Sequence, residues 1–220
     1  MLKILTKRDQ DDPSYDEMLR GRARVFRDRM KWNVDVIDGK EFDLYDRNGD
    51  PIYLISLNEI GRVVGSLRLL PTTGPTMLKS EFASMFRDPV DIESSTVWEC
   101  TRFCVHAGAD EMTPQTRNVA LQLLCGLCEL AYEFDIEGIV GVYDLPMLGV
   151  YKRLGWLPQV LSVSWPRFGK ICCGLWHVDA TIRDQLCNRV RACGLETFDF
   201  HNSLHSDKSV WTTPRIRRAG

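Results

Sequence analysis

Charged residues that stand among apolar neighbours are the first sign of chemistry in this sequence. At helical spacing, Arg22 shares a face with Met18 and Phe26, so its guanidinium points toward the core. A buried guanidinium without partners is strongly destabilising, so carboxylates are expected close to it; a snorkelling arginine at a solvated rim is the alternative. The nearest carboxylates that suit this role are those of Asp43 and Asp46.

Two strand-like segments carry further charges of this kind. Arg68 stands in an apolar segment, with an exposed edge position as the alternative to burial. Residues 96–105 are expected to form a central strand, yet they include Glu99 and Arg102. Strict alternation places these two side chains on opposite faces, and we expect a β-bulge to bring them together.

These residues form one set of three positive and three negative charges: Arg22, Asp43, Asp46, Arg68, Glu99 and Arg102. A buried network must approach neutrality to survive desolvation, but an apolar core would be at least as stable. The set therefore predicts a polar cavity for a charged or zwitterionic ligand, and a purely structural ion cluster is the alternative. Phe26 and Trp32 are expected to flank the cavity, where they can stack against a heterocycle or a sulfonium cation.

The N-terminal elements must position these charges. Ser14 to Glu17 have the pattern of a capping box, which predicts a helix from there to about residue 29. Residues 33–50 show no period and are expected to form a long, functional loop. Strands at 51–57 and 62–70 follow, joined as a hairpin.

The remaining elements alternate between helices and strands. They are expected at 82–86, 96–105, 114–134, 138–143, 148–154, 157–165, 170–177 and 179–193. This succession predicts an α/β fold, a three-layer sandwich around one mixed, mostly antiparallel sheet. Residues 1–193 are expected to form a single domain and residues 194–220 a polar C-terminal tail.

Composition and charge narrow the classes of function. The chain has 220 residues, of which 44% are hydrophobic and 26% charged, which is ordinary for a globular domain. The net charge of -2 argues against a general nucleic-acid binder, because such a protein needs a basic surplus. No segment has the length and apolarity of a signal peptide or a membrane span, so a soluble cytoplasmic protein is expected.

The eight cysteines do not have the placement of a disulfide framework. Cys125 and Cys128 have the spacing of metal and redox sites, but they lie in an apolar helix without a second pair of ligands at suitable spacing. Cysteine serves there as a small core residue, which fits a reducing compartment. No metal site is predicted.

Four motifs in order along the chain carry a resemblance. They are R-x-x-x-F-x-x-x-x-x-W, E-x-D-x-Y-D, R-L-L-P-T-T-G-P-x-M-L and W-E-x-x-R-F, from Arg22 to Phe103. Together they resemble the LuxI-type acyl-homoserine-lactone synthases, and a weaker pattern continues to about residue 190. The resemblance implies a fold similar to GCN5-related N-acyltransferases and two substrates, S-adenosylmethionine and an acyl thioester on acyl carrier protein or coenzyme A. It implies no cofactor, and we expect a monomer or weak dimer.

The resemblance also assigns roles to residues. Its functional positions fall on Arg22, Phe26, Trp32, Asp43, Asp46, Arg68, Glu99 and Arg102, and Phe103 joins the S-adenosylmethionine contacts. Its acyl pocket falls on Thr101, Val142 and Tyr143. Many members have serine where this chain has Thr101, which keeps the hydroxyl. Makers of 3-oxo-acyl signals often have threonine in place of Tyr143, so a 3-oxo product is not favoured. The bulk of Tyr143 and Trp156 favours a short, branched or aromatic chain.

The implied reaction has two bond-forming steps. The amine of S-adenosylmethionine attacks the thioester carbonyl, and its carboxylate then displaces methylthioadenosine and closes the lactone. Glu99 is the expected base, directly or through a water, with a contribution of about 10²- to 10⁴-fold; a backbone carbonyl with a water is the alternative. Arg22 and Arg102 are expected to orient the substrate carboxylate or hold the acidic residues, while Asp43 and Asp46 face the cationic end.

Two further expectations concern the acyl side. Backbone N–H groups near Phe103 or Val142 are expected to stabilise the tetrahedral oxyanion. If the donor is acyl carrier protein, which is acidic, it needs a basic surface, and Lys152 and Arg153 are the local candidates, with ordinary solvated residues as the alternative.

Two other classes of function are the alternatives. A plain acetyl-coenzyme A N-acetyltransferase needs a glycine-rich pyrophosphate turn before its long helix, and residues 106–115 do not supply one. A non-catalytic module that binds S-adenosylmethionine or a lipid is the second alternative.

Overall fold

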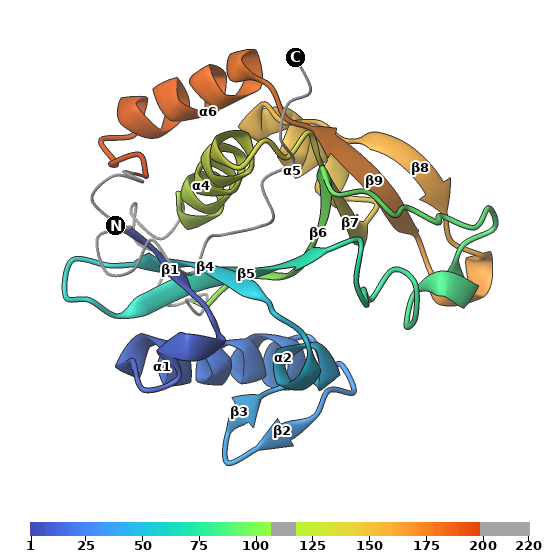
Figure 1. Ribbon diagram of the computed structural model, residues 1–220, viewed down its shortest axis with the longest axis horizontal. Helices are drawn as coiled ribbons and strands as arrows, with labels where there is room; N and C mark the ends of the chain where they lie inside the picture. The colour runs from blue at the N-terminus through green and yellow to red at the C-terminus, as the bar shows by residue number, and fades with distance from the viewer. Residues whose placement is uncertain (107–117, 199–220) are drawn as a thin grey trace, which may run out of the picture.

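A computed structural model describes residues 1–106 and 118–198. Its main sheet has seven strands in the order β1-β4-β5-β6-β7-β9-β8 (Figure 1). Their bounds are Leu2–Leu5 (β1), Ile52–Leu57 (β4), Val63–Pro71 (β5), Val97–Val105 (β6), Gly138–Asp144 (β7), Gln159–Val163 (β8) and Ile171–His177 (β9). Neighbours are antiparallel except for β6 and β7, which are parallel. The sheet is therefore mixed and mostly antiparallel, as predicted.

Helices cover both faces of this sheet (Figure 1). Helix α1 (Pro13–Ala23) and the short α2 (Leu44–Asn48) lie on one face, and α4 (Val119–Glu133) and α6 (Ala180–Ala192) on the other. Helix α5 (Met147–Leu154) follows β7, and short 3-10 helices occupy Lys7–Asp9, Ala83–Met85 and Pro166–Phe168. The three-layer prediction is confirmed. No helix within the described ranges is both long and apolar enough to cross a membrane.

The start of α1 differs from the prediction. Asp12, not Ser14, caps the helix: its side chain accepts the backbone N–H of Ser14 at 2.8 Å, and Pro13 occupies the first turn. The helix then continues as a π-helix over Arg24–Arg29. Such wide turns occur mostly at functional sites, and this one carries Phe26.

The prediction of a long loop at residues 33–50 is wrong for the centre of that segment. A hairpin of β2 (Val36–Ile37) and β3 (Lys40–Glu41) forms there, with Asp38 and Gly39 at its turn. Both turn residues have positive φ, 52° and 77°, and this is the turn that an Asp-Gly pair favours. The hairpin lies next to α1, on the same side of the main sheet and farther from it than the helix (Figure 1).

Helix α2 begins with a capping box made by two aspartates. Asp43 accepts the backbone N–H groups of Tyr45 and Asp46 at 2.9 and 3.1 Å. Asp46 in turn accepts the backbone N–H of Asp43 at 2.9 Å. The Asp43-x-x-Asp46 spacing is therefore a helix start, and the capping box orients both carboxylates through backbone N–H groups.

The predicted bulge lies in β6. Thr101 pairs with Arg68 and Cys104 with Ser66, so two residues of β6 oppose one residue of β5 between these pairs. Arg102 has a φ of 53°, and this left-handed residue turns β6 at the bulge.

Strands β6 and β7 separate soon after they pair. Their pairing covers Val97 to Glu99 against Gly138 to Val140, although both strands run further. A parallel pair that parts in this way opens the middle of the sheet.

The core and the chain ends agree with the prediction in part. The stripe of α4 at Val119, Leu123, Leu127 and Leu130 is buried. The expected start of this helix, at 114, lies outside the described residues, as does most of the expected tail. Strand β1, which the sequence analysis did not predict, pairs with β4 at the edge of the sheet.

Candidate functional site

Six buried or nearly buried charges form a closed ring beneath the sheet. In order around the ring they are Arg22, Glu41, Arg102, Asp43, Arg68 and Asp46. Each arginine bridges two carboxylates and each carboxylate bridges two arginines. The ring carries no net charge, which is the condition for a buried network to survive desolvation.

Half of the ring is built around Arg22. Its Nε donates to Glu41 Oε2 at 2.5 Å, and its two terminal nitrogens hold Asp46 in a fork at 3.1 and 2.8 Å. The Tyr53 hydroxyl also donates to Asp46, at 2.7 Å. Arg22 is 1% exposed and Asp46 0%, so Arg22 is not a snorkelling side chain at a solvated rim.

The other half of the ring is built around Arg68 and Arg102. Arg68 Nη1 donates to Asp43 at 2.6 Å and to Asp46 at 2.8 Å, while its Nε donates to the Thr101 hydroxyl at 3.0 Å. Arg102 Nη2 donates to Glu41 at 3.0 Å and to Asp43 at 2.9 Å. The side chains of Arg102 and Asp43 keep 9% and 15% exposure, so the ring is open at this edge alone.

The ring fixes the charge state of its members. Burial alone would raise the pKa of Asp46, but the guanidinium groups of Arg22 and Arg68 hold that pKa well below its usual range. Burial also opposes the charge on Arg22, and its carboxylate partners raise its pKa well above the ordinary value. Asp46 and Arg22 therefore stay ionised throughout the physiological range.

Glu99, which the sequence placed in the charge set, is not a member of the ring. Its two oxygens accept the backbone N–H groups of Met77 and Leu78 at 2.8 and 2.7 Å, and the residue is 0% exposed. Burial raises the pKa of Glu99 to about 7, although these two N–H groups lower it. The bulge is present as predicted, yet it turns Arg102 to Glu41 and Asp43 rather than to Glu99.

Met77 connects Glu99 to the ring. Its backbone donates to Glu99, and its sulfur accepts from Arg68 at 3.4 Å and from Arg102 at 3.3 Å. Glu99 therefore holds the turn that presents the Met77 thioether to two ring guanidinium groups.

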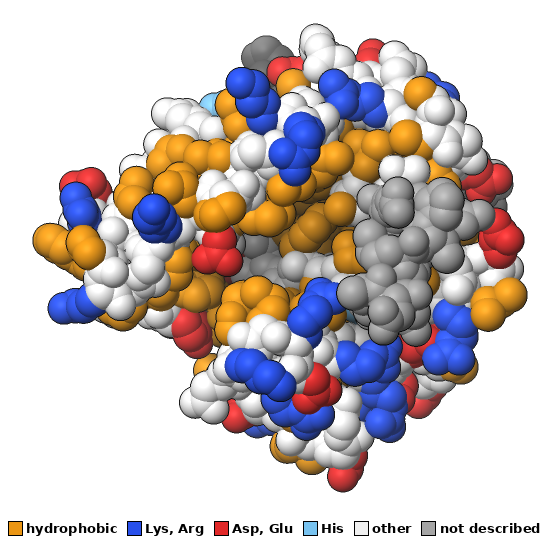
Figure 2. Space-filling view, turned by 180° about the vertical axis from the view of Figure 1, so that it is seen from behind, with side chains coloured by type: hydrophobic (Ala, Val, Ile, Leu, Met, Phe, Trp, Pro, Cys, Tyr) orange, Lys and Arg blue, Asp and Glu red, His pale blue; other side chains and the backbone are white. Residues whose placement is uncertain are grey.

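A cavity of about 230 Å³ lies where β6 and β7 part. Its walls come from both faces of the sheet. Phe26, Met30 and Trp32 lie on the α1 side, while Leu124 and Leu127 come from α4 on the opposite side. The cavity thus crosses the sheet, and Figure 2 shows a hollow lined by apolar side chains with Lys and Arg on its rim.

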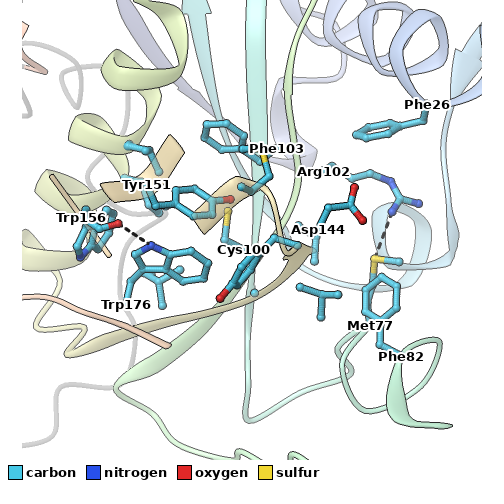
Figure 3. Close-up of a pocket in the computed structure, with 18 of the residues that line it drawn as sticks. Phe26, Met77, Phe82, Cys100, Arg102, Phe103, Asp144, Tyr151, Trp156 and Trp176 are labelled. Atoms are coloured by element: carbon cyan, nitrogen blue, oxygen red, sulfur yellow. Dashed lines mark hydrogen bonds between the residues drawn. The ribbon is translucent and has the colours of Figure 1, made fainter. Parts of the chain in front are cut away.

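One end of the cavity is charged and aromatic. The Arg102 guanidinium lies 5.4 Å from the centre of the Phe26 ring, and that ring stacks on Trp32 at 5.1 Å. Trp32 is 46% exposed, so the outer wall of this end faces solvent. Asp144, at the end of β7, also lines the cavity, and Figure 3 shows its carboxylate on the Arg102 side.

The other end is apolar and aromatic. The rings of Tyr143, Tyr151 and Trp176 meet edge to face at 5.0 to 5.4 Å. Trp156 closes this end, and its carbonyl accepts the indole N–H of Trp176 at 3.1 Å (Figure 3). The Tyr143 hydroxyl is buried and has no hydrogen-bond partner within residues 1–106 and 118–198, and Tyr143 is one of the residues that line the cavity.

The structure places the predicted site residues in four groups. Those that line the cavity are Phe26, Trp32, Thr101, Arg102, Phe103, Val142, Tyr143 and Trp156. Arg22, Asp43, Asp46 and Arg68 belong to the ring below it, and Glu99 lies behind Met77. Lys152 and Arg153 are exposed on α5, the helix that turns Tyr151 inward.

Three residues of the site escaped the sequence analysis. Glu41 stands two positions before Asp43, so its extended-chain spacing was a signal that both carboxylates share a face. Met77 and Asp144 gave no such signal, because their roles depend on the turn after β5 and on the parting of β6 and β7.

Comparisons with known proteins match this chain to autoinducer synthases, which include the acyl-homoserine-lactone synthases. The autoinducer synthase family matches residues 6–180. The acyl-homoserine-lactone synthase of Rhizobium etli is 55% identical over 182 residues, which are 82% of this chain and 85% of that protein. The acyl-homoserine-lactone synthase of Agrobacterium fabrum is 37% identical over 142 residues, 64% of this chain and 67% of that protein.

Solved structures show the same fold. The structure of the coenzyme A-dependent acyl-homoserine lactone synthase BjaI with SAM and isopentyl-CoA has a TM-score of 0.75 at 22% identity, covering 89% of this chain and 90% of BjaI. The acyl-homoserine-lactone synthase LasI has a TM-score of 0.72 at 25% identity, covering 90% of this chain and 97% of LasI.

Proposed function

This chain belongs to the autoinducer synthase family and is an acyl-homoserine-lactone synthase, and we propose that its two substrates meet inside the cavity that crosses the sheet. The difference between the two ends of the cavity carries the proposal. S-adenosylmethionine, which is charged and carries a heterocycle, suits the end with a guanidinium and stacked rings. An acyl chain suits the apolar end. The two reacting groups then meet between the parting strands.

The methionyl carboxylate of S-adenosylmethionine pairs with Arg102 in this proposal. Arg102 lines the cavity while the ring holds its other nitrogens, so the guanidinium is oriented before substrate arrives. Phe26 and Trp32 offer ring faces to the adenine or the sulfonium. Trp32 loses its exposure to solvent when the site fills.

Asp144 is our candidate for the partner of the cationic end. The sequence analysis gave that role to Asp43 and Asp46, but Asp46 is fully buried and neither residue lines the cavity. Their carboxylates hold the arginines instead. Asp144 lines the cavity and, within the described residues, forms no ion pair.

The first bond-forming step joins the amine to the acyl group. The amine nitrogen attacks the thioester carbonyl, the carbon–sulfur bond breaks, and the thiol leaves with a proton that came from the amine. Glu99 with a pKa of about 7 is suited to accept this proton near neutral pH, and we propose that it does so through a water. Direct contact is not favoured, because backbone N–H groups occupy both of its oxygens.

The second step closes the lactone. The methionyl carboxylate attacks the γ-carbon, the carbon–sulfur bond of the sulfonium breaks, and its electrons return to sulfur in methylthioadenosine. Backbone N–H groups of the parting strands near Phe103 or Val142 are our candidates to stabilise the oxyanion of the first step, since both residues line the cavity.

The acyl chain enters the apolar end, and we propose that it carries an oxygen substituent near the thioester. The Tyr143 hydroxyl is buried without a partner within the described residues, and an unpaired buried hydroxyl is costly. A hydroxyl on the chain would pair with it. This extends the expectation of a short, branched or aromatic chain, which rested on the bulk of Tyr143 and Trp156.

Purified chain supplied with S-adenosylmethionine and a series of acyl donors tests the function. Mass spectrometry should detect an acyl-homoserine lactone and an equal amount of methylthioadenosine. Each acyl group is offered on coenzyme A and on acyl carrier protein. A double reversal of Lys152 and Arg153 to glutamate should slow the carrier-bound donor alone. Failure with every donor in both forms would overturn the proposal.

A further inference from the structure

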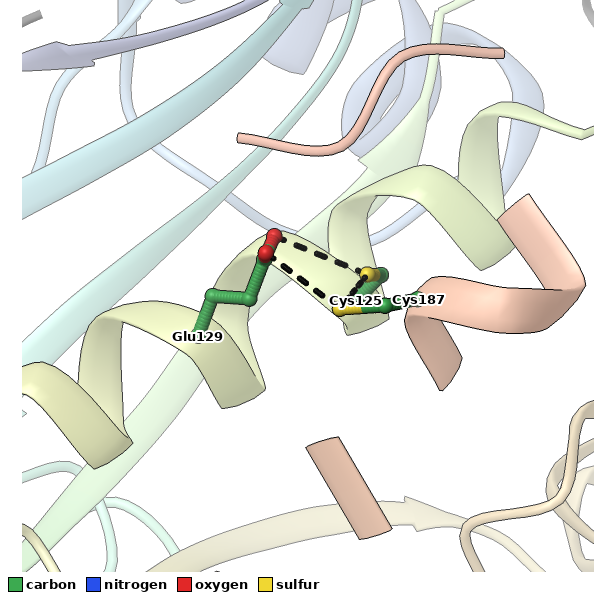
Figure 4. Close-up of side chains that lie close together, drawn as sticks. All are labelled: Cys125, Glu129 and Cys187. Carbon is green, nitrogen blue, oxygen red and sulfur yellow. Dashed lines mark hydrogen bonds between the residues drawn. The ribbon is translucent and has the colours of Figure 1, made fainter. Parts of the chain in front are cut away.

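A cluster of two cysteines and a glutamate lies between α4 and α6, away from the cavity. Cys125 and Glu129 are one helical turn apart on α4, and Cys187 faces them from α6 (Figure 4). Both cysteines are buried, while Glu129 keeps partial exposure. One donor atom from each residue lies within 4.8 Å of the other two.

The three side chains form a triangle. The two sulfurs are 3.5 Å apart, Cys125 Sγ lies 3.6 Å from Glu129 Oε2, and Cys187 Sγ lies 3.3 Å from Glu129 Oε1. Zinc–sulfur bonds of about 2.3 Å and zinc–oxygen bonds of about 2.0 Å at tetrahedral angles require separations of about 3.8 Å between sulfurs and about 3.5 Å between sulfur and oxygen. The separations in the cluster are close to these lengths, with a different carboxylate oxygen next to each sulfur.

The surroundings also suit a cation. The thiols of Cys125 and Cys187 donate weakly to the Glu129 carboxylate, at 3.6 and 3.3 Å. A bound divalent ion would take the place of these thiol protons, because a metal deprotonates its thiol ligands.

The cluster has a second layer of support and a path for an ion. The backbone N–H of Phe198 donates to Glu129 at 3.0 Å, which orients the carboxylate from the chain beyond α6. The partial exposure of Glu129 leaves one side of the triangle close to solvent.

We propose that Cys125, Glu129 and Cys187 bind one zinc ion, with water as the fourth ligand. Two sulfurs and one oxygen in tetrahedral geometry favour zinc over the harder divalent ions. The ion would fasten α6 and the segment at Phe198 to α4, so its role is structural. The sequence analysis considered Cys128 as the partner of Cys125, whereas the fold brings Cys187 to it instead.

Metal analysis of the purified, unmodified chain tests this directly. After chelation and dialysis, the protein should take up one equivalent of zinc per chain, and cobalt should give the sulfur-to-metal charge-transfer and intense d–d bands of a tetrahedral thiolate site. Thermal unfolding should shift to higher temperature on reloading.

Matched variants decide whether these residues are the ligands. Cys187→Ser and Glu129→Gln should lose the cobalt bands, while Cys128→Ser, one position earlier than Glu129 on the same helix, should keep them. Glu129→Gln keeps the size of the side chain, so it remains informative if a cysteine variant does not fold. No stoichiometric uptake by wild type, bands that survive in Glu129→Gln and Cys187→Ser, or a Cys125–Cys187 disulfide in protein purified without oxidant would overturn the proposal.

Discussion

Arg22 donates to Glu41 through Nε at 2.5 Å, with 1% of the arginine and none of the glutamate exposed. Glu41 also accepts a hydrogen bond from Arg102. Arg22 on α1 and Arg102, which lines the cavity, therefore share one carboxylate. A change at Glu41 should therefore affect both the stability of the fold and the site.

Glu41→Gln should lower the free energy of unfolding by about 3 to 5 kcal/mol, because it leaves an uncompensated positive charge in the ring. Urea denaturation measures the loss. The exposed Glu133 provides the control, and Glu133→Gln should change stability by less than about 0.5 kcal/mol. Equal losses in the two variants would contradict the importance of the ring.

Two single variants, each with lysine in place of one ring arginine, should separate an effect on substrate binding from an effect on the stability of the fold. Arg102→Lys should raise the KM for S-adenosylmethionine by about 10- to 100-fold, since a charge-assisted hydrogen bond at the cavity is lost. Arg22→Lys should act mainly on unfolding, because Arg22 is buried and does not line the cavity. The same KM change in both variants would show that Arg102 acts only through the fold.

Glu99 should make stability depend on pH. Its pKa is about 7 in the fold against 4.5 ordinarily, so the folded state binds the extra proton between these values. The stabilisation that protonated Glu99 gives the fold is fully present below about pH 4.5 and is lost as the pH rises through about 7. The free energy of unfolding should fall by about 3 kcal/mol at most over this interval.

Urea denaturation at several pH values compares wild type with Glu99→Gln, whose amide does not titrate. The difference between the two unfolding free energies should shift over the acidic interval and level off at alkaline pH. In activity, kcat/KM of wild type should rise through about pH 7 if Glu99 accepts the proton, and Glu99→Gln should lack this limb. Parallel stability curves would refute the assigned pKa.

Asp144→Asn tests the partner of the sulfonium. Removal of a carboxylate at the charged end should raise the KM for S-adenosylmethionine by about 10-fold, which corresponds to a loss of about 1.4 kcal/mol in binding free energy. The free energy of unfolding should not change. Asp50→Asn, an exposed residue away from the cavity, is the control. An unchanged KM would remove Asp144 from the site.

Tyr143→Phe tests the recognition of the acyl chain. Wild type should prefer a 3-hydroxyacyl donor over the unsubstituted chain of the same length, because the unpaired Tyr143 hydroxyl gains a partner, and the variant should lose about 10-fold of this preference in kcat/KM. Tyr132→Phe removes a hydroxyl from an exposed residue on α4 and should change nothing. A preference that persists in Tyr143→Phe would point to another residue, whereas no product from any donor would instead overturn the proposed function.

Much of the fold was predictable because its strands and the long helix bury their apolar residues at regular spacing. The stripe on α4 follows from its period, and the pairing of β4 with β5 follows from the hairpin turn at residues 58–61. The hairpin at residues 36–41 was missed because its strands have two residues each, too few for a period to show, and its Asp-Gly turn was the remaining signal.

The site was predictable in its charges but not in its connections. Five of the six charges picked from the sequence lie in the ring, and the sixth, Glu99, belongs to the turn at Met77. The sequence shows which charged residues stand in apolar strands. It does not show their ion-pair partners, because these depend on which loop folds over each strand. The cavity itself was out of reach, since the separation of β6 from β7 is a tertiary property with no local pattern.

The parting of β6 and β7 has a consequence for redesign of the product. In the proposed arrangement, the surface that meets the reacting atoms where the strands separate is main chain, which every amino acid supplies alike. The same proposal assigns chain selectivity to the side chains of α4, α5 and β9 at the apolar end of the cavity. Substitutions of the side chains at the acyl end should therefore change which acyl chain is accepted, while the main-chain groups next to the reacting atoms stay the same.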